Sequence, residues 1–524
     1  MTDPFPDGAS GLGSRVSNLA GEQPEEQPGS AGPAHPSPAN PLSQQAKSGV
    51  AWSGLSRVLI QLVQFGSSIA LARLLTPSDY GLVAIVASFT GFALLFTDLG
   101  LGAAIIHRAK VEESLLAAAF WLNALTGFAL TGLFCGLAVP LAHLYGKPAL
   151  VPLIIIGSLV FSLSLNVVQL ALLERSLRFK LVGTIEVSAS VMAVTVSISC
   201  AASGLGAVSL VFGALTQVTV TTVGMWLAVR WRPRQFVTRA ALRELWAFSS
   251  HLFGFNVVNY WARNADNLLI GKFASAAVLG FYSRAYNLMM LPVQQVTSVI
   301  GRVLFPALSR LRHDHERLGR AYLRALVVMT ALGTLLSVVL ATSATAFVDV
   351  AYGHRWHAAA PLLALLAASG PAQVVSGTVG ALYQALGLTR SQFRRGTINA
   401  VVTVAAIVIG LRWGATGVAV ALLMKFYVML PFTVHGCWRE IDLGVVYVLK
   451  KLAPIAASAG VSVAAGLAVG SALSDQSKVL VLIAQLAAMA LGYALCLTAI
   501  SPMIVAELRQ LLRRNPGHGR GYAQ

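Results

Sequence analysis

The chain consists of long apolar segments, separated by short polar connections, between Val50 and Pro502. A helix needs about 20 apolar residues to cross the hydrocarbon core of a bilayer, and we count about fourteen segments of this kind. We therefore predict an all-α polytopic membrane protein. The predicted spans are 50–74, 80–106, 114–141, 148–172, 182–203, 206–229, 244–271, 277–306, 322–347, 358–386, 396–411, 414–436, 446–471 and 478–500.

Polar side chains recur at helical spacing inside three of these spans. Steps of three and four residues place them on one face of each helix. Lipid cannot satisfy an amide or an ion, so these faces are predicted to border a water-filled transport pathway. The alternative is a polar seam that only packs helices together. The residues are Ser53, Arg57, Gln61, Gln64 and Ser68 in 50–74, Asn256, Asn259, Arg263, Asp266 and Asn267 in 244–271, and Arg284, Asn287, Gln295, Ser298 and Arg302 in 277–306.

The arginines of these polar faces indicate a class of substrate. If Arg57, Arg263 and Arg284 converge, the cavity is cationic and selects anions. A guanidinium binds two phosphate oxygens at once, so a lipid-linked diphosphate would suit the cavity. Asp266 is interpreted either as a salt-bridge partner of Arg263 or as the group that couples transport to H⁺ or Na⁺. The predicted cavity residues are Arg57, Gln61, Gln64, Asn259, Arg263, Arg284 and Asn287.

Composition favours a membrane protein over a soluble one. The chain has 524 residues, of which 56% are hydrophobic and 11% are charged, and its mean hydropathy is +0.71. Its formal charge of +18 would indicate nucleic-acid binding in a soluble protein. Here 27 of the 38 Lys and Arg residues fall in the tails and in alternate connections, as expected for cytoplasmic segments. We therefore expect both termini in the cytoplasm, membrane lipids as partners and no nucleic acid.

The membrane region contains a weak internal repeat. Leu71–Gly81 resembles Ile270–Gly280, because in each a polar helix ends near a lone cation and a glycine opens the next helix. An even number of predicted spans separates the copies, which favours two six-helix lobes in parallel orientation. The predicted divisions are a disordered cytoplasmic tail at 1–46, an N-lobe at 47–232, a C-lobe at 233–438, two further spans within 439–503 and a basic cytoplasmic tail at 504–524.

Common motifs of catalysis and metal binding do not occur in the sequence. It contains no GxxxxGKS/T phosphate loop, no HExxH and no GxSxG, and its four cysteines are far apart. We expect no enzyme activity, no disulfide, no metal and no cofactor. Two histidine pairs remain, His313 with His315 and His354 with His357. We interpret both as surface residues. The alternatives are a metal site for the first pair and a ligand or proton-relay role for the second.

Five short segments together carry a family resemblance. They are Ala72–Gly81, Thr97–Ile106, Asp266–Lys272, Leu279–Leu288 and Phe305–Pro306. The combination resembles the Wzx-type polysaccharide flippases of the multidrug/oligosaccharidyl-lipid/polysaccharide (MOP) exporter superfamily, over about residues 47–500. One departure is that Ala276–Gly280 lacks the proline and the acid of Pro77–Gly81, so the two halves are not expected to be functionally equivalent.

This resemblance implies both a fold and a function. Proteins of the family have two six-helix lobes around a central cavity and often two extra C-terminal helices. They flip undecaprenyl-diphosphate-linked oligosaccharide repeat units across the cytoplasmic (inner) membrane by alternating access, for exopolysaccharide or lipopolysaccharide biosynthesis. Polysaccharide polymerase and export machinery are the implied protein partners. Related lipid flippases bind the lipid tail in a groove of their last two helices, which correspond to 446–471 and 478–500 here.

Alternative functions differ in the chemistry that they need within the membrane. A MOP-superfamily exporter of a drug or metabolite would share the fold, but exporters of small cations need acidic cavities. A non-transport component of a polysaccharide assembly machine would not need ions in mid-membrane. A membrane glycosyltransferase or polymerase would need a large catalytic loop, and no connection is long enough for one. The polar pattern therefore favours a flippase for lipid-linked glycans.

Overall fold

The structure, a computed structural model, describes residues 41–98, 102, 105–106, 112–235, 260–261, 263–299, 304–502, 504 and 506. Within these ranges the secondary structure is helical and includes no strand. Nine of the described helices are long and apolar enough to cross a membrane, or up to eleven spans if each of two bent helix pairs is one span. The predicted all-α membrane architecture is thereby confirmed. The predicted spans 80–106, 244–271 and 277–306 lie partly outside the described residues.

The helices of the N-terminal half follow the predicted spans with two exceptions. Helix α1 begins at Pro41, before the predicted span 50–74 and within the segment 1–46 that was predicted to be disordered. The predicted span 148–172 is divided into two helices, α5 and α6, which are bent by 43°. The bounds are α1 Pro41–Leu74, α2 Pro77–Asp98, α4 Glu113–Tyr145, α5 Leu150–Leu163, α6 Val167–Arg175, α7 Phe179–Ala202 and α8 Val208–Ala228.

Polar side chains explain the break between α5 and α6. Ser164 Oγ donates a hydrogen bond at 2.6 Å to a carbonyl oxygen of the preceding turn, and bonds of this type compete with continuation of the helix. Two side chains of α8 bind carbonyl oxygens near the break. Thr222 Oγ1 donates to the Leu163 oxygen at 2.8 Å, and Trp226 Nε1 donates to the Leu165 oxygen at 2.6 Å. Because its carbonyl groups have partners, the irregular backbone is tolerated within the membrane.

The C-terminal half contains the second bent pair. The predicted span 358–386 is divided into α14 and α15, which are bent by 45°. Pro371 stands at the start of α15, and its missing N–H group interrupts the series of helical hydrogen bonds. Residues 263–273 are also helical. The remaining bounds are α10 Ala276–Val299, α11 Phe305–Arg310, α12 His315–Thr342, α13 Ala344–Ala351, η2 His354–Trp356, α14 Ala359–Ala368, α15 Gly370–Ala385, α16 Thr389–Gly410, η3 Leu411–Trp413, α17 Gly414–Arg439, α18 Val445–Ala472 and α19 Lys478–Ile500.

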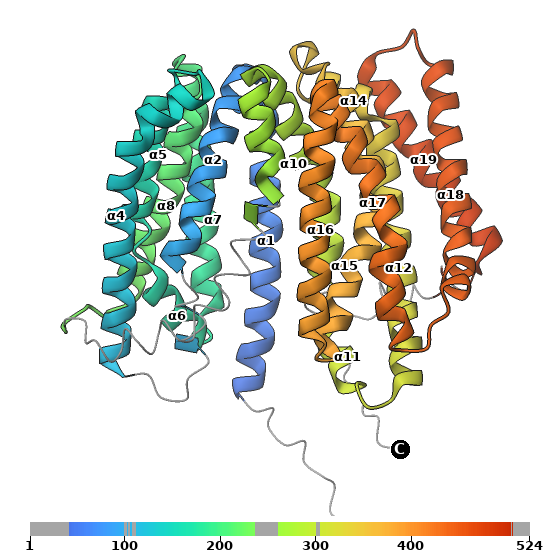
Figure 1. The fold of residues 1–524 in the computed structure, drawn as a ribbon, viewed down its shortest axis with the longest axis horizontal. Helices are drawn as coiled ribbons and strands as arrows, with labels where there is room; N and C mark the ends of the chain where they lie inside the picture. The colour runs from blue at the N-terminus through green and yellow to red at the C-terminus, as the bar shows by residue number, and fades with distance from the viewer. Residues whose placement is uncertain are drawn as a thin grey trace, which may run out of the picture. The chain divides into compact units, whose positions relative to one another are not determined.

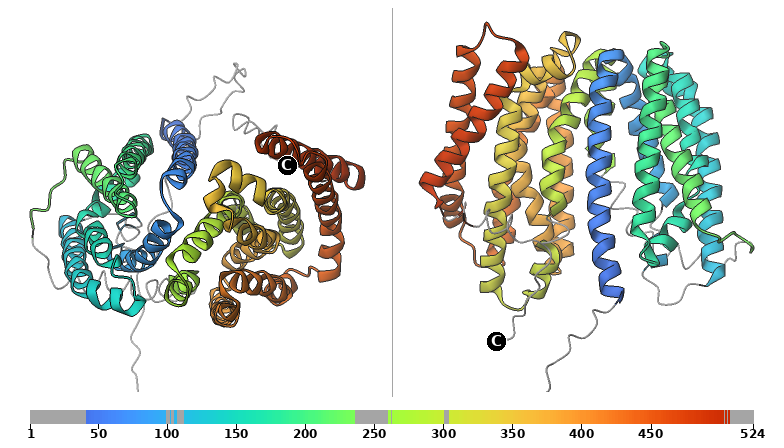
Figure 2. Two further views of the ribbon diagram at one scale, coloured as in Figure 1. Left: turned by 90° about the horizontal axis from the view of Figure 1, so that it is seen from above. Right: turned by 180° about the vertical axis from the view of Figure 1, so that it is seen from behind.

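The membrane helices form two groups, with α1 between them in the view of Figure 1. Helices α2 and α4–α8 make one group, and α10–α17 make the other; α18 and α19 pack as a pair against the outer side of the second group (Figure 2). The two groups share buried apolar residues. One hydrophobic cluster includes Ile85 of α2, Ile154 of α5, Tyr282 of α10 and Leu363 of α14. The space between the groups is therefore closed by packed side chains along part of its length.

The first turns of α2 and α10 touch through their backbones. A Cβ atom at Gly81 would lie 1.7 Å from the Ala276 oxygen, and a Cβ atom at Gly280 would lie 1.8 Å from the Pro77 oxygen. The two pairs are related by one offset of 199 residues along the chain. A reciprocal contact is what a twofold relation between repeats produces, so the structure confirms the internal repeat. We call the end of the bundle that contains residues 75–76 and 274–275 the turn end.

Alanine at either glycine is predicted to destabilise the protein. Its methyl group would overlap a backbone oxygen, and that oxygen can move only if α2 separates from α10. Overpacking of this kind costs about 1–3 kcal/mol. Gly81→Ala and Gly280→Ala should therefore each lower the midpoint of thermal unfolding of the detergent-solubilised protein.

Gly132 of α4 provides the matched control for this experiment. A Cβ atom at Gly132 would meet no atom within 4 Å. Gly132→Ala should leave the midpoint unchanged or raise it, because alanine is the better helix former. Wild-type midpoints for both the Gly81 and the Gly280 variants would contradict the proposed role of the backbone contact.

Candidate functional site

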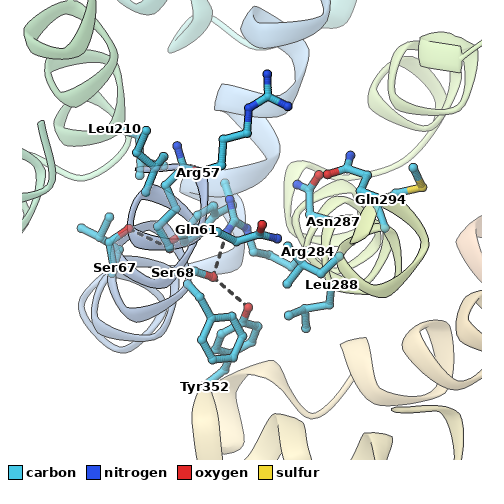
Figure 3. Close-up of a pocket in the computed structure, with 17 residues that line it drawn as sticks. Arg57, Gln61, Ser67, Ser68, Leu210, Arg284, Asn287, Leu288, Gln294 and Tyr352 are labelled. Carbon is cyan, nitrogen blue, oxygen red and sulfur yellow. Dashed lines mark hydrogen bonds between the residues drawn. The ribbon is translucent and has the colours of Figure 1, made fainter. Parts of the chain in front are cut away.

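A polar pocket lies between α1 and α10 within the membrane-spanning part of the chain. Its volume is about 560 Å³, within the range of about 300–1,000 Å³ that is typical of small-molecule sites. Figure 3 shows polar side chains of both helices directed toward it. The lining residues are Arg57, Ile60, Gln61, Gln64, Phe65, Ser67, Ser68, Leu71, Tyr80, Leu210, Arg284, Asn287, Leu288, Met290, Leu291, Gln294 and Tyr352.

Arg284 of α10 is held in this pocket by side chains from other segments. Its Nη1 donates to Ser68 Oγ of α1 at 3.3 Å, and its guanidinium lies 4.0 Å from the ring centre of Tyr80 of α2. Ser68 Oγ also forms a hydrogen bond of 2.8 Å with the hydroxyl of Tyr352 (Figure 3). A cation above an aromatic face is stabilised by the quadrupole of the ring. Arg284 therefore has a defined position although it lies in a membrane helix.

Two polar atoms beside the pocket have no partner in the described part of the chain. The Nε atom of Arg284 and the hydroxyl of Tyr80 are buried, and neither has a hydrogen-bond partner among the described residues. No described carboxylate forms an ion pair with Arg284 either. Buried donors without partners cost free energy. Arg284 thus brings a positive charge without a described counter-charge to the pocket wall, so the site is suited to a negatively charged group.

The segment that follows α12 fixes the end of α1 beside this site. Trp356 is fully buried, and its Nε1 donates to the Ala72 oxygen of α1 at 2.7 Å. Arg73 Nη2 donates to the Val350 oxygen at 2.6 Å. Tyr80 and Trp356 also meet edge to face, with ring centres 5.2 Å apart. These contacts fix the last turn of α1, and Ser68 lies only one turn before it.

A second group of charges surrounds Arg57, farther along α1 from the turn end. Arg57 interacts electrostatically with Glu174 of α6 and Glu186 of α7. Ser68 follows Arg57 by eleven residues, which corresponds to about 16 Å along a helix. The two arginines thus border different depths of one pocket. Neither glutamate was predicted from the sequence, because site residues were sought along the polar faces that carry arginines. The sequence feature that indicated Glu186 was an acidic residue within the predicted span 182–203.

The structure brings together most of the predicted cavity residues. Arg57, Gln61, Gln64, Arg284 and Asn287 all line the pocket. Gln61 of α1 also accepts a hydrogen bond from the amide of Gln295 of α10. Tyr80 and Tyr352 were missed, because neither belongs to a polar face at helical spacing. Predicted residues Asn256, Asn259 and Arg302 lie outside the described residues.

Two predicted residues of the 263–273 helix lie away from this pocket. Arg263 has an exposed side chain and is not among the lining residues. Asp266 is 3% exposed, and its Oδ2 accepts a hydrogen bond from the Tyr282 hydroxyl at 2.8 Å. The ion pairs of the described residues do not include one between Asp266 and Arg263, so the interpretation of Asp266 as a salt-bridge partner of Arg263 finds no support: the Asp266 carboxylate is bonded to Tyr282 of α10, whereas the Arg263 side chain is exposed. The side-chain partner of the buried carboxyl is a tyrosine of the neighbouring helix.

Comparisons with known proteins agree with this architecture. The chain is 26% identical to the lipopolysaccharide biosynthesis protein WzxC of Escherichia coli strain K12, over 76% of this chain and 84% of WzxC. It is 28% identical to the succinoglycan biosynthesis transport protein ExoT of Rhizobium meliloti strain 1021, over 69% of this chain and 73% of ExoT.

Two solved structures resemble the fold. The lipid II flippase MurJ in an inward closed conformation has a TM-score of 0.71 and 15% identity, over 88% of this chain and 99% of MurJ. An inward-facing multidrug resistance transporter of the MATE family and MOP superfamily has a TM-score of 0.56 and 16% identity, over 73% of this chain and 94% of the transporter. At these identities the likeness concerns the fold alone. A family model described as "Polysaccharide biosynthesis protein" matches residues 70–361. Because this match spans more than half of the sequence, the chain belongs to the polysaccharide biosynthesis protein family.

Proposed function

We propose that the protein flips undecaprenyl-diphosphate-linked oligosaccharide repeat units across the cytoplasmic membrane, for exopolysaccharide or lipopolysaccharide biosynthesis. The family, the names of WzxC and ExoT and the MOP-type fold support this function. The substrate would be delivered by cytoplasmic glycosyl transfer and consumed by a polymerase and an export machinery. We propose no catalytic step for the chain itself.

The single observation that carries the proposal is the unsatisfied arginine of the pocket. Arg284 has a buried Nε atom without a partner, and the planar guanidinium can offer two parallel N–H groups to phosphate oxygens. The hydroxyl of Tyr80, beside the same guanidinium, is a further buried donor. Gln64 and Asn287 line the same pocket and are suited to bind sugar hydroxyls. The lipid tail would remain in the membrane, along α18 and α19.

The two arginines suggest an order of binding. With both termini in the cytoplasm, the turn end is the outer end of the pocket and Arg57 lies nearer the inner leaflet. Glu174 and Glu186 offset part of the charge of Arg57, so Arg57 would attract the diphosphate only weakly. Arg284, which has no described acid as an ion-pair partner, would bind it more strongly. The headgroup would therefore meet Arg57 first and Arg284 second.

Alternating access would then require the turn end to open. In the described conformation the backbones of α2 and α10 touch there, at Gly81 and Gly280. We propose that this contact closes the outer end while the substrate binds, and that rocking of one helix group against the other separates it. The reciprocal form of the contact suits such a motion, because both halves of the contact part together when α2 separates from α10.

Asp266 is proposed as the group that couples this motion to H⁺ or Na⁺. Its carboxyl is buried and bonded to Tyr282 of α10, on the hairpin that contains Arg284. Protonation of the carboxyl, or binding of Na⁺ to it, would change its bond to Tyr282 and thereby the position of α10. Because lipid cannot stabilise a charge, an acid buried at this depth is expected to have a function.

Removal of the Arg284 guanidinium is predicted to stop export. Arg284→Ala should lower export of the polysaccharide at least tenfold at an unchanged level of protein in the membrane. Arg284→Lys should give an intermediate value, because lysine keeps the charge but loses the bidentate geometry. Arg412→Ala, which removes an exposed arginine of η3, is the matched control and should export normally. Normal export by Arg284→Ala would refute the anion site.

Loss of the Asp266 charge is predicted to uncouple transport from its gradient. In proteoliposomes, transport by the wild-type protein should rise when a pH or Na⁺ gradient is applied, and Asp266→Asn should abolish this rise. Tyr282→Phe keeps the carboxyl but removes the bond that connects it to α10, so it should weaken the response as well. An undiminished response in Asp266→Asn would show that Asp266 has only a structural role.

A further inference from the structure

A cluster of two histidines and one aspartate lies at the turn end, apart from the pocket. Asp349 belongs to α13, and His354 and His357 lie at and directly after η2. One ligand atom from each residue lies within 4.8 Å of the other two. We propose that these three residues bind a divalent transition metal of the zinc class. This inference is independent of the proposed transport function.

The donor set has the chemistry of a zinc site. Two imidazoles and one carboxylate are the ligands that Zn²⁺ prefers when cysteine is absent, and three protein ligands leave a fourth position for water. His357 Nδ1 already lies 3.0 Å from Asp349 Oδ1. The rings of His354 and His357 lie 5.6 Å apart and are tilted by 34°. Zinc–ligand bonds of about 2.0–2.2 Å would require only small rotations of the exposed histidine side chains.

The backbone of the cluster is fixed by its neighbours. His354 and His357 are three residues apart, and in a 3-10 turn side chains at this spacing lie on one face. Trp356, between them, is fully buried and is bonded to the Ala72 oxygen. Gly353, before the turn, has a φ of +89°, which glycine adopts without strain. The backbone segment that carries the two imidazoles is therefore rigid, which reduces the conformational entropy lost on metal binding.

Lys478 forms an ion pair with Asp349 and would compete with a metal ion for this carboxylate. Its Nζ lies 2.8 Å from Asp349 Oδ2, and it begins α19. The Asp349 side chain is only 7% exposed, whereas that of Lys478 is 65% exposed. The carboxylate is thus held in place by the protein, and the lysine is the partner that can leave. A divalent cation that binds Asp349 would repel Lys478 and weaken the connection between α13 and α19.

The other histidine pair lacks these features. His313 lies in the connection before α12 and His315 is the first residue of that helix. The Nε of Arg312 donates to His313 Nε2 at 2.9 Å. His315 Nδ1 is bonded to the Glu440 oxygen at 2.9 Å. A cation at His313 would meet the positive charge of Arg312. This pair therefore provides the matched control for the proposed site.

Metal titration of the purified protein tests the proposal. The full-length protein, without a polyhistidine tag, would be freed of metal in detergent and titrated with Zn²⁺ by calorimetry and with Co²⁺ by its visible absorption. We expect one ion per chain. Asp349→Asn and the double variant His354→Ala/His357→Ala should each weaken binding at least tenfold, whereas His313→Ala/His315→Ala should bind as the wild type does.

Lys478→Met distinguishes a metal site from a salt bridge that merely stabilises the protein. This variant keeps all three ligands and removes the competing cation, so it should bind Zn²⁺ several-fold more tightly than the wild type. If this variant bound Zn²⁺ as tightly as the wild type or more weakly, Lys478 would not compete with the metal for Asp349. Absence of Zn²⁺ binding by the wild type, or binding that is unchanged in both ligand variants, would overturn the site itself. Thermal unfolding of each variant without metal controls for misfolding.

Discussion

An arginine in a membrane helix must find its partners within the protein, because lipid offers neither hydrogen-bond acceptors nor counter-charges. Arg284 meets this requirement through Ser68 of α1 and the ring of Tyr80 of α2. Those partners depend in turn on the corner at Tyr352 and Trp356, which binds the last turn of α1. The arginine is held, yet its Nε remains unsatisfied. The combination of a fixed position and a positive charge without a described counter-charge is the basis of an anion site.

The same corner connects the pocket to the surface of the turn end. Trp356 packs against Tyr80 and Tyr352 in an aromatic cluster, and His357, the next residue, is bonded to Asp349. On the other side of Tyr80, Gly81 brings α2 into backbone contact with α10. Closure of the turn end, the position of Arg284 and the geometry of the histidine pair therefore depend on one set of packed residues. A motion that separates α2 from α10 would change all three together.

Sequence patterns predicted the fold well but not its breaks. Long apolar segments identified the spans, because helix length and hydrophobicity follow directly from bilayer thickness. The bends at Ser164 and before Pro371 were not predicted, although Ser164 and the sequence Ser369–Pro371 interrupt the apolar segments there. The side chains that stabilise the first break belong to α8. The repeat, seen only as a weak resemblance, proved to be a reciprocal contact at Gly81 and Gly280.

The site was predicted only in part, for a similar reason. Periodicity along α1 and α10 identified Arg57, Gln61, Gln64, Arg284 and Asn287, which share one pocket. Periodicity within a single helix cannot show which neighbouring helix a polar side chain meets, so the pairing of Asp266 with Tyr282 was missed. The contribution of Tyr352 follows from tertiary packing and is not visible in a single helical segment, whereas Glu186 was visible as an acid within a predicted span but its partner Arg57 was not.

The most direct test of the central claim is the location of the lipid-linked glycan in cells that lack this protein. The account predicts that the undecaprenyl-diphosphate-linked repeat unit accumulates in the cytoplasmic leaflet, where external enzymes cannot reach it. Restoring the wild-type protein should make it accessible from outside. Accumulation in the outer leaflet would contradict the account, because translocation would then proceed without the protein. Loss of the intermediate would also contradict it, and would indicate a role in assembly of the glycan before translocation.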